Sequence, residues 1–485
     1  MDYKDLICSV IAHIEQGIKG KSDYEAMASE VGFSYHHIRD VFKKATNISL
    51  SQYIATRKIA NAAFEMRHLP RNIIDIAMDY DFENVDTFTR AFKRDTGLTP
   101  SGFKKSSHLC GRRIIAPGVY APVILDLENP RFRLPKLMEV NEMAELRKTA
   151  DSCILYGVPK VHFGRTVDEQ EQFSYFPMCL QAVLNYMGQN MSYDELMAYT
   201  GTGFRQRWYS GGWDDGAVDA RNVYTNPLET FERGFLGAGR TFNISTNTTI
   251  NKEGAIALIK AELDCGRPVI ALGVVGPPEA CIITGYRDNG ETLLGWSLFQ
   301  EWCCEEFDES GYFIKRNWWS ETEGIMTIGE EVGNRTSDKD VLKNGLMLMM
   351  AADMPTYGGE GWLYYGGGKA LEAWAQALED NLEHDGDIAE CHDDQQGMLR
   401  DRLYAARYVR SLADKYPQAK DELMDAARGL YAIADCNSKI HAARMSGYTD
   451  LLEEPLRKEM AAIIREAAAL EKQACVALEK AIAKL

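Results

Sequence analysis

One cysteine in this sequence stands where nucleophilic chemistry is possible. Cys179 falls in the first turn of FPMCLQAVLNYMG (176–188), whose apolar residues recur with helical spacing. A helix N-terminus lowers the pKa of a thiol, but a cysteine nucleophile also needs a neighbouring histidine as its base. The chain has no histidine between His162 and His384. The predicted helix therefore places a thiol without an obvious proton acceptor.

The residues after this helix predict an antiparallel sheet. Strands are expected at 268–275, 280–286, 291–296, 311–315 and 324–328, and the Asp288-Asn-Gly sequence between two of them is a strong hairpin signal. A helix followed by an antiparallel sheet indicates an α+β unit.

Cys179 followed by AVLNYMG, with the later strand ACIITGYRDNGETLLGWS, resembles the papain-like cysteine peptidase fold. The similarity is to bacterial leader-peptidase-like domains and to butirosin biosynthesis protein H, an acyltransferase, and it spans about residues 151–350. It implies a histidine at the start of the central strand, where this chain has Glu279, and an Asn or Asp where it has Gly295-Trp296-Ser297. Gln172 lies one residue further from the cysteine than the usual oxyanion glutamine. Because a neighbouring carboxylate raises the pKa of a thiol, we expect a catalytically inactive relative.

We expect the former active site to bind an effector instead, and its lining would comprise Cys179, Trp213, Glu279 and Trp296. Glu279 would favour a cationic or amine-bearing ligand, with added cation–π attraction from the indoles. The alternatives are a buried core thiol and a glutamate paired with an arginine. The aromatic loop 208–216 could close over the site or simply pack.

A second group of polar residues follows a pattern that occurs twice near the N-terminus. Residues 79–105, DYDFENVDTFTRAFKRDTGLTPSGFKK, predict a turn and a short helix, and 28–54 repeat the pattern. Two such units joined by a long helix resemble the AraC/XylS family of bacterial transcription regulators. The matching positions are Phe33, Phe42, Lys43 and Tyr53 in the first unit, and Phe82, Phe92, Lys93 and Phe103 in the second.

The resemblance implies that the second helix of each unit enters a major groove of double-stranded DNA and presents its first turn to the bases. Arginine can bond a guanine through two hydrogen bonds, and histidine can donate to a purine. The alternative for the adjacent histidines is a merely exposed helix face. The expected DNA-contacting residues are Ser34, Tyr35, His36, His37, Arg39, Lys43, Asn84, Val85, Asp86, Thr89, Arg90 and Lys93.

Several helix starts can also be predicted, with Ser34, Asn72 and Asn84 as caps. Ser22 with Glu25, and Ser49 with Gln52, have the spacing of capping boxes. Asp81 stands where the family usually has a glycine, and aspartate can adopt the left-handed conformation that this turn needs.

Length and charge support a multidomain protein. We expect a tandem helix-turn-helix domain at 1–108, a linker at 109–150 with a possible strand at 118–125, an α+β papain-like domain at 151–355 and a helical bundle at 356–485. The net charge of −17 divides into +3 for residues 1–113 and −20 for the remainder. Neither a signal peptide nor a membrane span is expected, and the eleven cysteines lack a framework, which indicates free thiols in the cytoplasm.

In the helical bundle, the glycine run 366–368 predicts a turn rather than an anion site. His384, His392 and the aspartates around them are interpreted as an acidic loop. We expect no metal and no cofactor.

These observations favour a one-component transcription regulator whose DNA-binding units are controlled by a small-molecule or peptide effector, with RNA polymerase as a further partner and a homodimer as one possible assembly. The alternative is a Cys179-dependent acyltransferase or amidase fused to a DNA-binding module. A third hypothesis is a protein-interaction scaffold without a small ligand.

Overall fold

The computed structural model describes residues 3–46, 49–68, 71–96, 98–105, 145–161, 164–165, 171–172, 174–304, 306–355, 363–380, 386–443, 451 and 454–485. The strand expected at 118–125 and most of the expected linker lie outside these ranges. So do His384 and Asp385.

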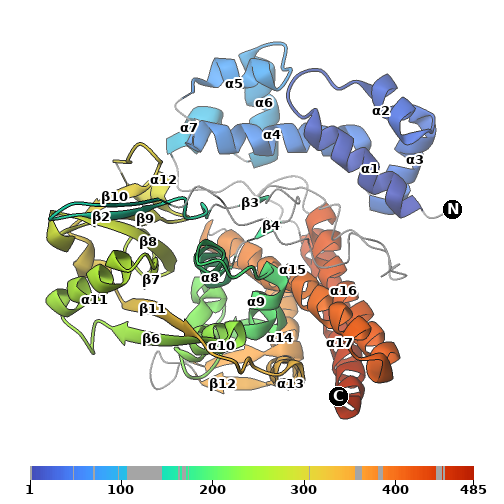
Figure 1. Cartoon of the computed structure of the whole chain (residues 1–485). Coiled ribbons are helices and arrows are strands. Elements are labelled where there is room, and N and C mark those ends of the chain that lie inside the picture. The colour runs from blue at the N-terminus through green and yellow to red at the C-terminus, as the bar shows by residue number, and fades with distance from the viewer. Residues whose placement is uncertain are drawn as a thin grey trace.

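Among the described residues up to 105, the chain forms seven helices (Figure 1). Their apolar faces build two small cores, one around Phe42 and Tyr53 and one around Phe88 and Phe92. The expected tandem helix-turn-helix arrangement is thereby confirmed. The helices are α1 (Tyr3–Gln16), α2 (Tyr24–Val31), α3 (Tyr35–Thr46), α4 (Leu50–His68), α5 (Ile73–Asp79), α6 (Val85–Thr96) and α7 (Pro100–Lys105).

Side-chain caps start most of these helices where the sequence predicts them. Ser49 accepts from the Gln52 N–H at 3.1 Å and begins α4. The box predicted at Ser22 is wrong, because Asp23 caps α2 and accepts from both the Glu25 and the Ala26 N–H groups. A carboxylate that satisfies two of the free N–H groups of the first turn leaves no role for the serine one residue earlier.

Asp81 does adopt the left-handed conformation, with φ of 63°, and the equivalent Gly32 has φ of 71°. Its carboxylate lies 3.7 Å from the Lys58 ammonium on α4. The Lys58 side chain is only 10% exposed and also donates to the Gly20 carbonyl at 2.8 Å. The aspartate that replaces the glycine therefore partners a largely buried lysine.

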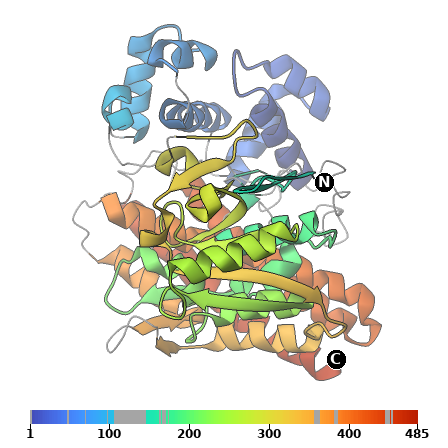
Figure 2. The ribbon, with the colours of Figure 1, turned by 60° about the vertical axis from the view of Figure 1, so that its left-hand side comes forward.

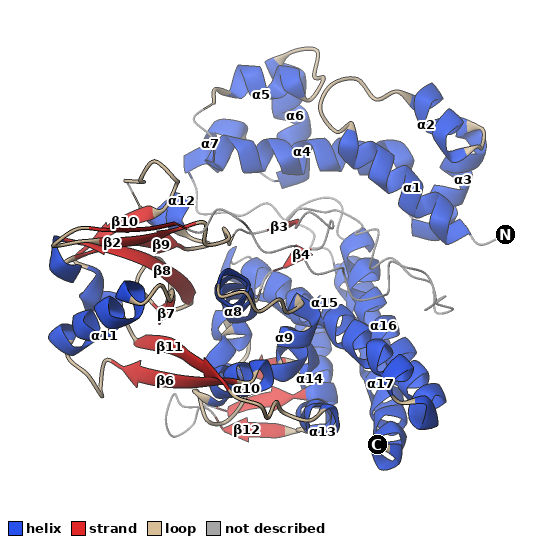
Figure 3. Cartoon of the chain, in the orientation of Figure 1, coloured by secondary structure: helices blue, strands red, loops and turns tan. Residues whose placement is uncertain are grey.

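An antiparallel sheet dominates the α+β region (Figure 3). Its strand order is β1-β2-β8-β7-β11-β6, and β9 pairs with both β8 and β10. Asp288, Asn289 and Gly290 all have positive φ and form the predicted hairpin between β8 and β9. The strands are β1 (Glu145–Lys148), β2 (Cys153–Tyr156), β6 (Arg240–Thr246), β7 (Val269–Leu272), β8 (Ala280–Arg287), β9 (Thr292–Trp296), β10 (Phe313–Arg316) and β11 (Gly324–Glu331).

Helices and short strands surround this sheet. The helices are α8 (Tyr175–Tyr186), α9 (Tyr193–Tyr199), α10 (Glu229–Ala238), α11 (Lys252–Asp264), α12 (Gln300–Cys303) and α13 (Asp338–Met350). The smaller sheets comprise β3 (Gly164–Arg165) with β4 (Glu171–Gln172), and β5 (Arg207–Tyr209) with β12 (Asp353–Pro355) and β13 (Leu363–Gly366).

The C-terminal helices are α14 (Gly367–Glu379), α15 (Gly386–Lys415), α16 (Lys420–Ala443) and α17 (Glu454–Lys484). Figure 2 shows them beside the sheet region. One hydrophobic core runs from Cys153 to Ile482 and joins both parts. The helices thus complete the core of the α+β region.

Candidate nucleic-acid interface and ligand site

Helix α3 presents a polar face beside a buried apolar one. Ile38 and Phe42 are almost fully buried. His36 is exposed and lies 3.2 Å from Asp40 on the next turn, whereas the partly buried His37 stacks on Phe33 with ring centroids 5.2 Å apart. Tyr35 is also partly buried. The exposed expected contacts on and before α3 are Ser34, His36, Arg39 and Lys43.

Helix α6 repeats this arrangement. Asn84 accepts from the Thr87 N–H at 2.8 Å and caps the helix, while Phe88 and Phe92 are fully buried beneath it. Its sequence-predicted residues remain on the other face: Asp86, Arg90 and Lys93 are exposed, and Val85 and Thr89 are partly buried. The two helices therefore offer two comparable cationic surfaces.

A polar network links the two units. Glu65 on α4 accepts from the buried Tyr80 hydroxyl at 2.8 Å and from Arg71 at 2.8 Å, and the Lys19 ammonium lies 2.5 Å away. Arg71 also donates to Asp79 at 2.7 Å. Hydrogen bonds from Lys19, Tyr80 and Arg71 outweigh burial and hold the pKa of Glu65 below its usual value. Residues that follow α1 are thus tied to α4 and α5.

Cys179 is fully buried in the first turn of α8, and its thiol contacts the Ala280 carbonyl oxygen at 3.4 Å. Burial raises the pKa of Cys179 well above its ordinary value, and Cys281 and Glu279 raise it further. A helix N-terminus favours a thiolate, yet here desolvation and nearby negative charge outweigh it. The thiol is therefore a poor nucleophile in this environment.

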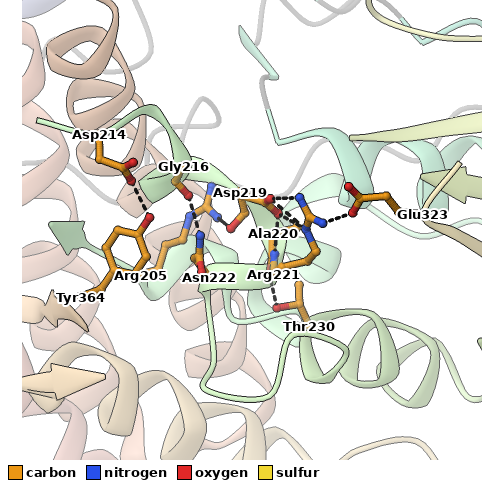
Figure 4. Close-up of polar contacts among 10 residues, drawn as sticks. All are labelled: Arg205, Asp214, Gly216, Asp219, Ala220, Arg221, Asn222, Thr230, Glu323 and Tyr364. Atoms are coloured by element: carbon orange, nitrogen blue, oxygen red, sulfur yellow. Dashed lines mark hydrogen bonds and ion pairs between the residues drawn. The ribbon is translucent and has the colours of Figure 1, made fainter. Parts of the chain in front are cut away.

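Glu279 directly precedes β8 and is partly exposed. Burial raises its pKa well above the ordinary value, Asp219 raises it further, and Arg205 and Arg221 oppose this. Asp219 holds Arg221 through hydrogen bonds to the guanidinium, and Arg221 also pairs with Glu323 (Figure 4). The structure thus brings Cys179 and Glu279 together, as the sequence predicts, and adds a charged cluster beside them.

The two expected tryptophans lie in separate packing contacts. Trp296 donates to the Val158 carbonyl at 2.9 Å and packs edge-on against Tyr312. Trp213 packs against Trp208 and lies near the His392 ring. The loop that carries Trp213 is therefore packed on α15, which favours the packing alternative for this loop.

Arg205 and Asp219 were not singled out from the sequence. Arg205 lies in the segment TGFRQRWY, which crosses the core. Arg402, which forms a bidentate buried pair with Glu471, donates to the Arg205 carbonyl at 2.8 Å and so holds the backbone of Arg205. The sequence signal was available, because two arginines flank a glutamine within an aromatic, apolar stretch. Because buried arginines need partners, two arginines in such a stretch predict a buried polar cluster.

His392, Asp393 and Asp394 lie within helix α15, so the acidic loop expected there is wrong for these residues. The buried His392 ring accepts from the Trp374 indole N–H at 3.0 Å. In the part of the chain that is described, no three His, Cys, Asp or Glu side chains gather as metal ligands. None of the helices described there combines the length and apolar character needed to cross a bilayer.

Comparison with known proteins assigns the N-terminal part. Residues 27–106 match the family model described as a helix-turn-helix domain. The chain is 33% identical over 104 residues to the regulatory protein SoxS of Escherichia coli, which is 21% of this chain and 97% of SoxS. It is also 33% identical over 104 residues to the transcriptional regulator Rob of Salmonella typhimurium, again 21% of this chain but 35% of Rob. The right origin-binding protein of Escherichia coli is 32% identical over 103 residues, 21% of this chain and 34% of its own length. The chain therefore spans about a third of the length of Rob and of the right origin-binding protein, and the similarity concerns about one fifth of this chain.

Proposed function

Because this chain belongs to the AraC family of helix-turn-helix transcription regulators, we propose that it binds promoter DNA sequence-specifically and regulates transcription in response to a ligand. The single observation that carries the DNA-binding part is the repeated pair of capped helices α3 and α6. Each has an aromatic underside and exposed cations. We also propose RNA polymerase as a partner and the cytoplasm as the location of the protein.

Arg39 and Lys43 on α3, and Arg90 and Lys93 on α6, are the cations we assign to the DNA. Arginine supplies base readout, and lysine neutralises phosphate. Because Asp86 on α6 is a carboxylate in the exposed first turn, α3 contributes more of the base readout. With a net charge of only +3 in residues 1–113, binding depends on a few placed contacts.

We assign control to residues 151–485. The proposal is a catalytically inactive papain-like domain whose former active site binds the effector. A buried Cys179 with a raised pKa and a carboxylate at the expected histidine position support inactivity. The same geometry argues against the alternative, a cysteine-dependent acyltransferase or amidase. Helices α14–α17 share the core of this domain, so they support the site, and they are also our candidate surface for a homodimer.

DNA binding is tested with the full chain and a fluorescent DNA fragment from upstream of its own gene. Replacing Arg39 and Lys93 together by alanine should weaken specific binding at least about tenfold, since one base contact alone is worth about 1–3 kcal/mol. The salt dependence of binding should also become shallower, because each phosphate contact contributes a slope of about 0.9.

A matched control removes two cations from the same domain away from the recognition helices. Lys21→Ala with Lys104→Ala changes the net charge equally at two exposed positions. This control should retain most of the specific affinity. Wild-type protein that never discriminates its own upstream region from unrelated DNA, or equal losses in both double variants, would contradict the assignment.

A further inference from the structure

Arg205 is a buried arginine with few partners. Its side chain is 1% exposed. One guanidinium nitrogen donates to the Asp219 carbonyl at 3.2 Å, as Figure 4 shows, and no carboxylate of the described residues lies within ion-pair distance. The buried Nε has no hydrogen-bond acceptor among those residues. Burial lowers the pKa of Arg205, although Asp401 and Glu279 oppose this effect.

Glu279 is its counterpart of opposite charge. Its side chain makes no hydrogen bond or ion pair with any residue that the structure describes. The next residue, Ala280, accepts from the Cys179 thiol at 3.4 Å, which places Glu279 beside the first turn of α8, and the charge of Arg205 opposes the rise in the pKa of Glu279. A charged group that loses water without gaining a partner of opposite charge is destabilised, and this cost is larger for the buried Arg205 than for the partly exposed Glu279.

The start of α8 belongs to the same environment. The N-cap residue Ser174 does not cap the helix with its side chain, because its hydroxyl donates to the buried Asp401 at 3.1 Å. The next residue, Tyr175, is partly exposed and interacts electrostatically with Glu279, Asp394 and Arg205. The Ser174 N–H donates to the Tyr193 hydroxyl at 3.1 Å and Pro177 has no N–H, so this helix start offers an anion the N–H groups of Tyr175 and Phe176.

We propose that Arg205, Glu279 and the start of α8 form a binding site for a small zwitterion with the chemistry of a free α-amino acid. The inference rests on the ligand control proposed above and names the class of ligand. The ligand carboxylate pairs with Arg205 and the N–H groups of α8, while its ammonium pairs with Glu279. A molecule with both charges gives each protein group the partner that it lacks.

Neighbouring groups restrict the alternatives. Asp219 is occupied by Arg221, which in turn pairs with Glu323, so the ligand ammonium has Glu279 as its principal partner. The pair of Arg402 and Glu471 fixes the backbone that carries Arg205. The helical region thus positions Arg205. Ligand binding is therefore linked to the packing of α15 and α17.

The test measures thermal unfolding and calorimetric binding of the full chain with the standard L-α-amino acids at millimolar concentration. At least one should raise the melting temperature by several degrees. Its amide, which lacks the carboxylate, and its carboxylic acid analogue without the amine should each bind at least about tenfold more weakly. This comparison uses the wild-type protein and does not depend on a variant that folds.

Two substitutions then assign the groups. Glu279→Gln should weaken binding of the zwitterion at least about tenfold and lessen the preference over the analogue without the amine. Arg205→Lys should also weaken binding of the zwitterion at least about tenfold, and it should lessen the preference over the amide. Glu291→Gln, at an exposed glutamate that pairs with Lys252, serves as the matched control and should bind like the wild type.

The proposal is overturned if no amino acid shifts the melting temperature, or if the amide and the analogue without the amine bind as well as the zwitterion. It is also overturned if both site variants bind like the control. DNA binding is measured on the same samples without ligand. Specific DNA binding without amino-acid binding refutes this site alone, whereas loss of DNA specificity refutes the proposed function.

Discussion

Substitution of Glu65 by glutamine tests whether the network between α4 and α5 holds the two DNA-binding units in register. The change keeps the shape of the side chain and removes the charge that three donors share: the Tyr80 hydroxyl, Arg71 and Lys19. Arg71 and Lys19 are 30% and 50% exposed, so each of these ion pairs contributes at most about 1 kcal/mol. The bond from the buried tyrosine to a charged acceptor adds about 1.5–3 kcal/mol.

These terms sum to about 1.5–5 kcal/mol. Because the glutamine oxygen still accepts hydrogen bonds as a neutral group, we expect local opening of α5 to become easier by about 2–3 kcal/mol, which is an increase of about 30- to 150-fold in amide exchange. Hydrogen exchange with mass spectrometry on the full chain measures it in residues 73–80. The exposed Glu25 provides a matched control, because Glu25→Gln removes the same charge from the same domain. A change below about threefold at residues 73–80, or an equal change in the control, would refute the reasoning.

The pH dependence gives a second check. The pKa of Glu65 is lowered in the folded protein, so the ionised carboxylate contributes stability above its unfolded value of about 4.3. This contribution is lost as the pH falls through the folded value. The difference in exchange between wild type and Glu65→Gln should therefore be full at neutral pH and shrink below about pH 4.

Three further predictions concern the remainder of the chain. Glu471→Gln should lower the free energy of unfolding by about 3–5 kcal/mol, because it leaves Arg402 buried without its charged partner, whereas replacing both residues by methionine should restore most of this stability. Urea unfolding followed by tryptophan fluorescence measures both variants, and a double variant as unstable as the single one would contradict the prediction. Gly295→Ala should destabilise the sheet by at least about 2 kcal/mol, because a Cβ would lie 1.8 Å from a carbonyl oxygen of the neighbouring strand, while Gly333→Ala, with open space around it, should cost little. Cys179 should react with iodoacetamide at pH 7 more slowly than the exposed thiols, as peptide mapping would show, and preferential labelling of Cys179 would revive the enzyme alternative.

The parts of the fold that could be predicted depend on sequence signals within a few adjacent residues. The caps at Ser34, Ser49, Asn72 and Asn84 depend on a few adjacent residues, and all four are present. The hairpin at residues 288–290 is likewise a property of three residues, Asp, Asn and Gly, that tolerate positive φ. The error at Ser22 is also local, since two good capping residues are adjacent and only the geometry decides between them.

The proposed ligand site could be predicted only in part, because its members come from distant segments. Cys179 and Glu279 could be paired through a family resemblance, since both belong to the pattern that carries it. Arg205 belongs to no such pattern. Its position depends on Arg402 in α15 and Glu471 in α17, and such long-range packing leaves no local spacing in the sequence. Trp213 and Trp296 are expected to line the same site, whereas each packs with its own neighbours.

Two departures from family patterns have opposite physical outcomes. Asp81 replaces a glycine and adopts a left-handed conformation that costs an ordinary residue about 1–2 kcal/mol. Its carboxylate lies 3.7 Å from Lys58, a lysine that burial alone would make less stable in its charged form. The new charge therefore has a partner within the fold, and this substitution is structural. Glu279 stands where the proposed papain-like domain would have a histidine, and its side chain pairs with none of the described residues. A carboxylate that gains no partner from its own chain costs stability unless something else pairs with it, which is why the second departure, and not the first, indicates a ligand.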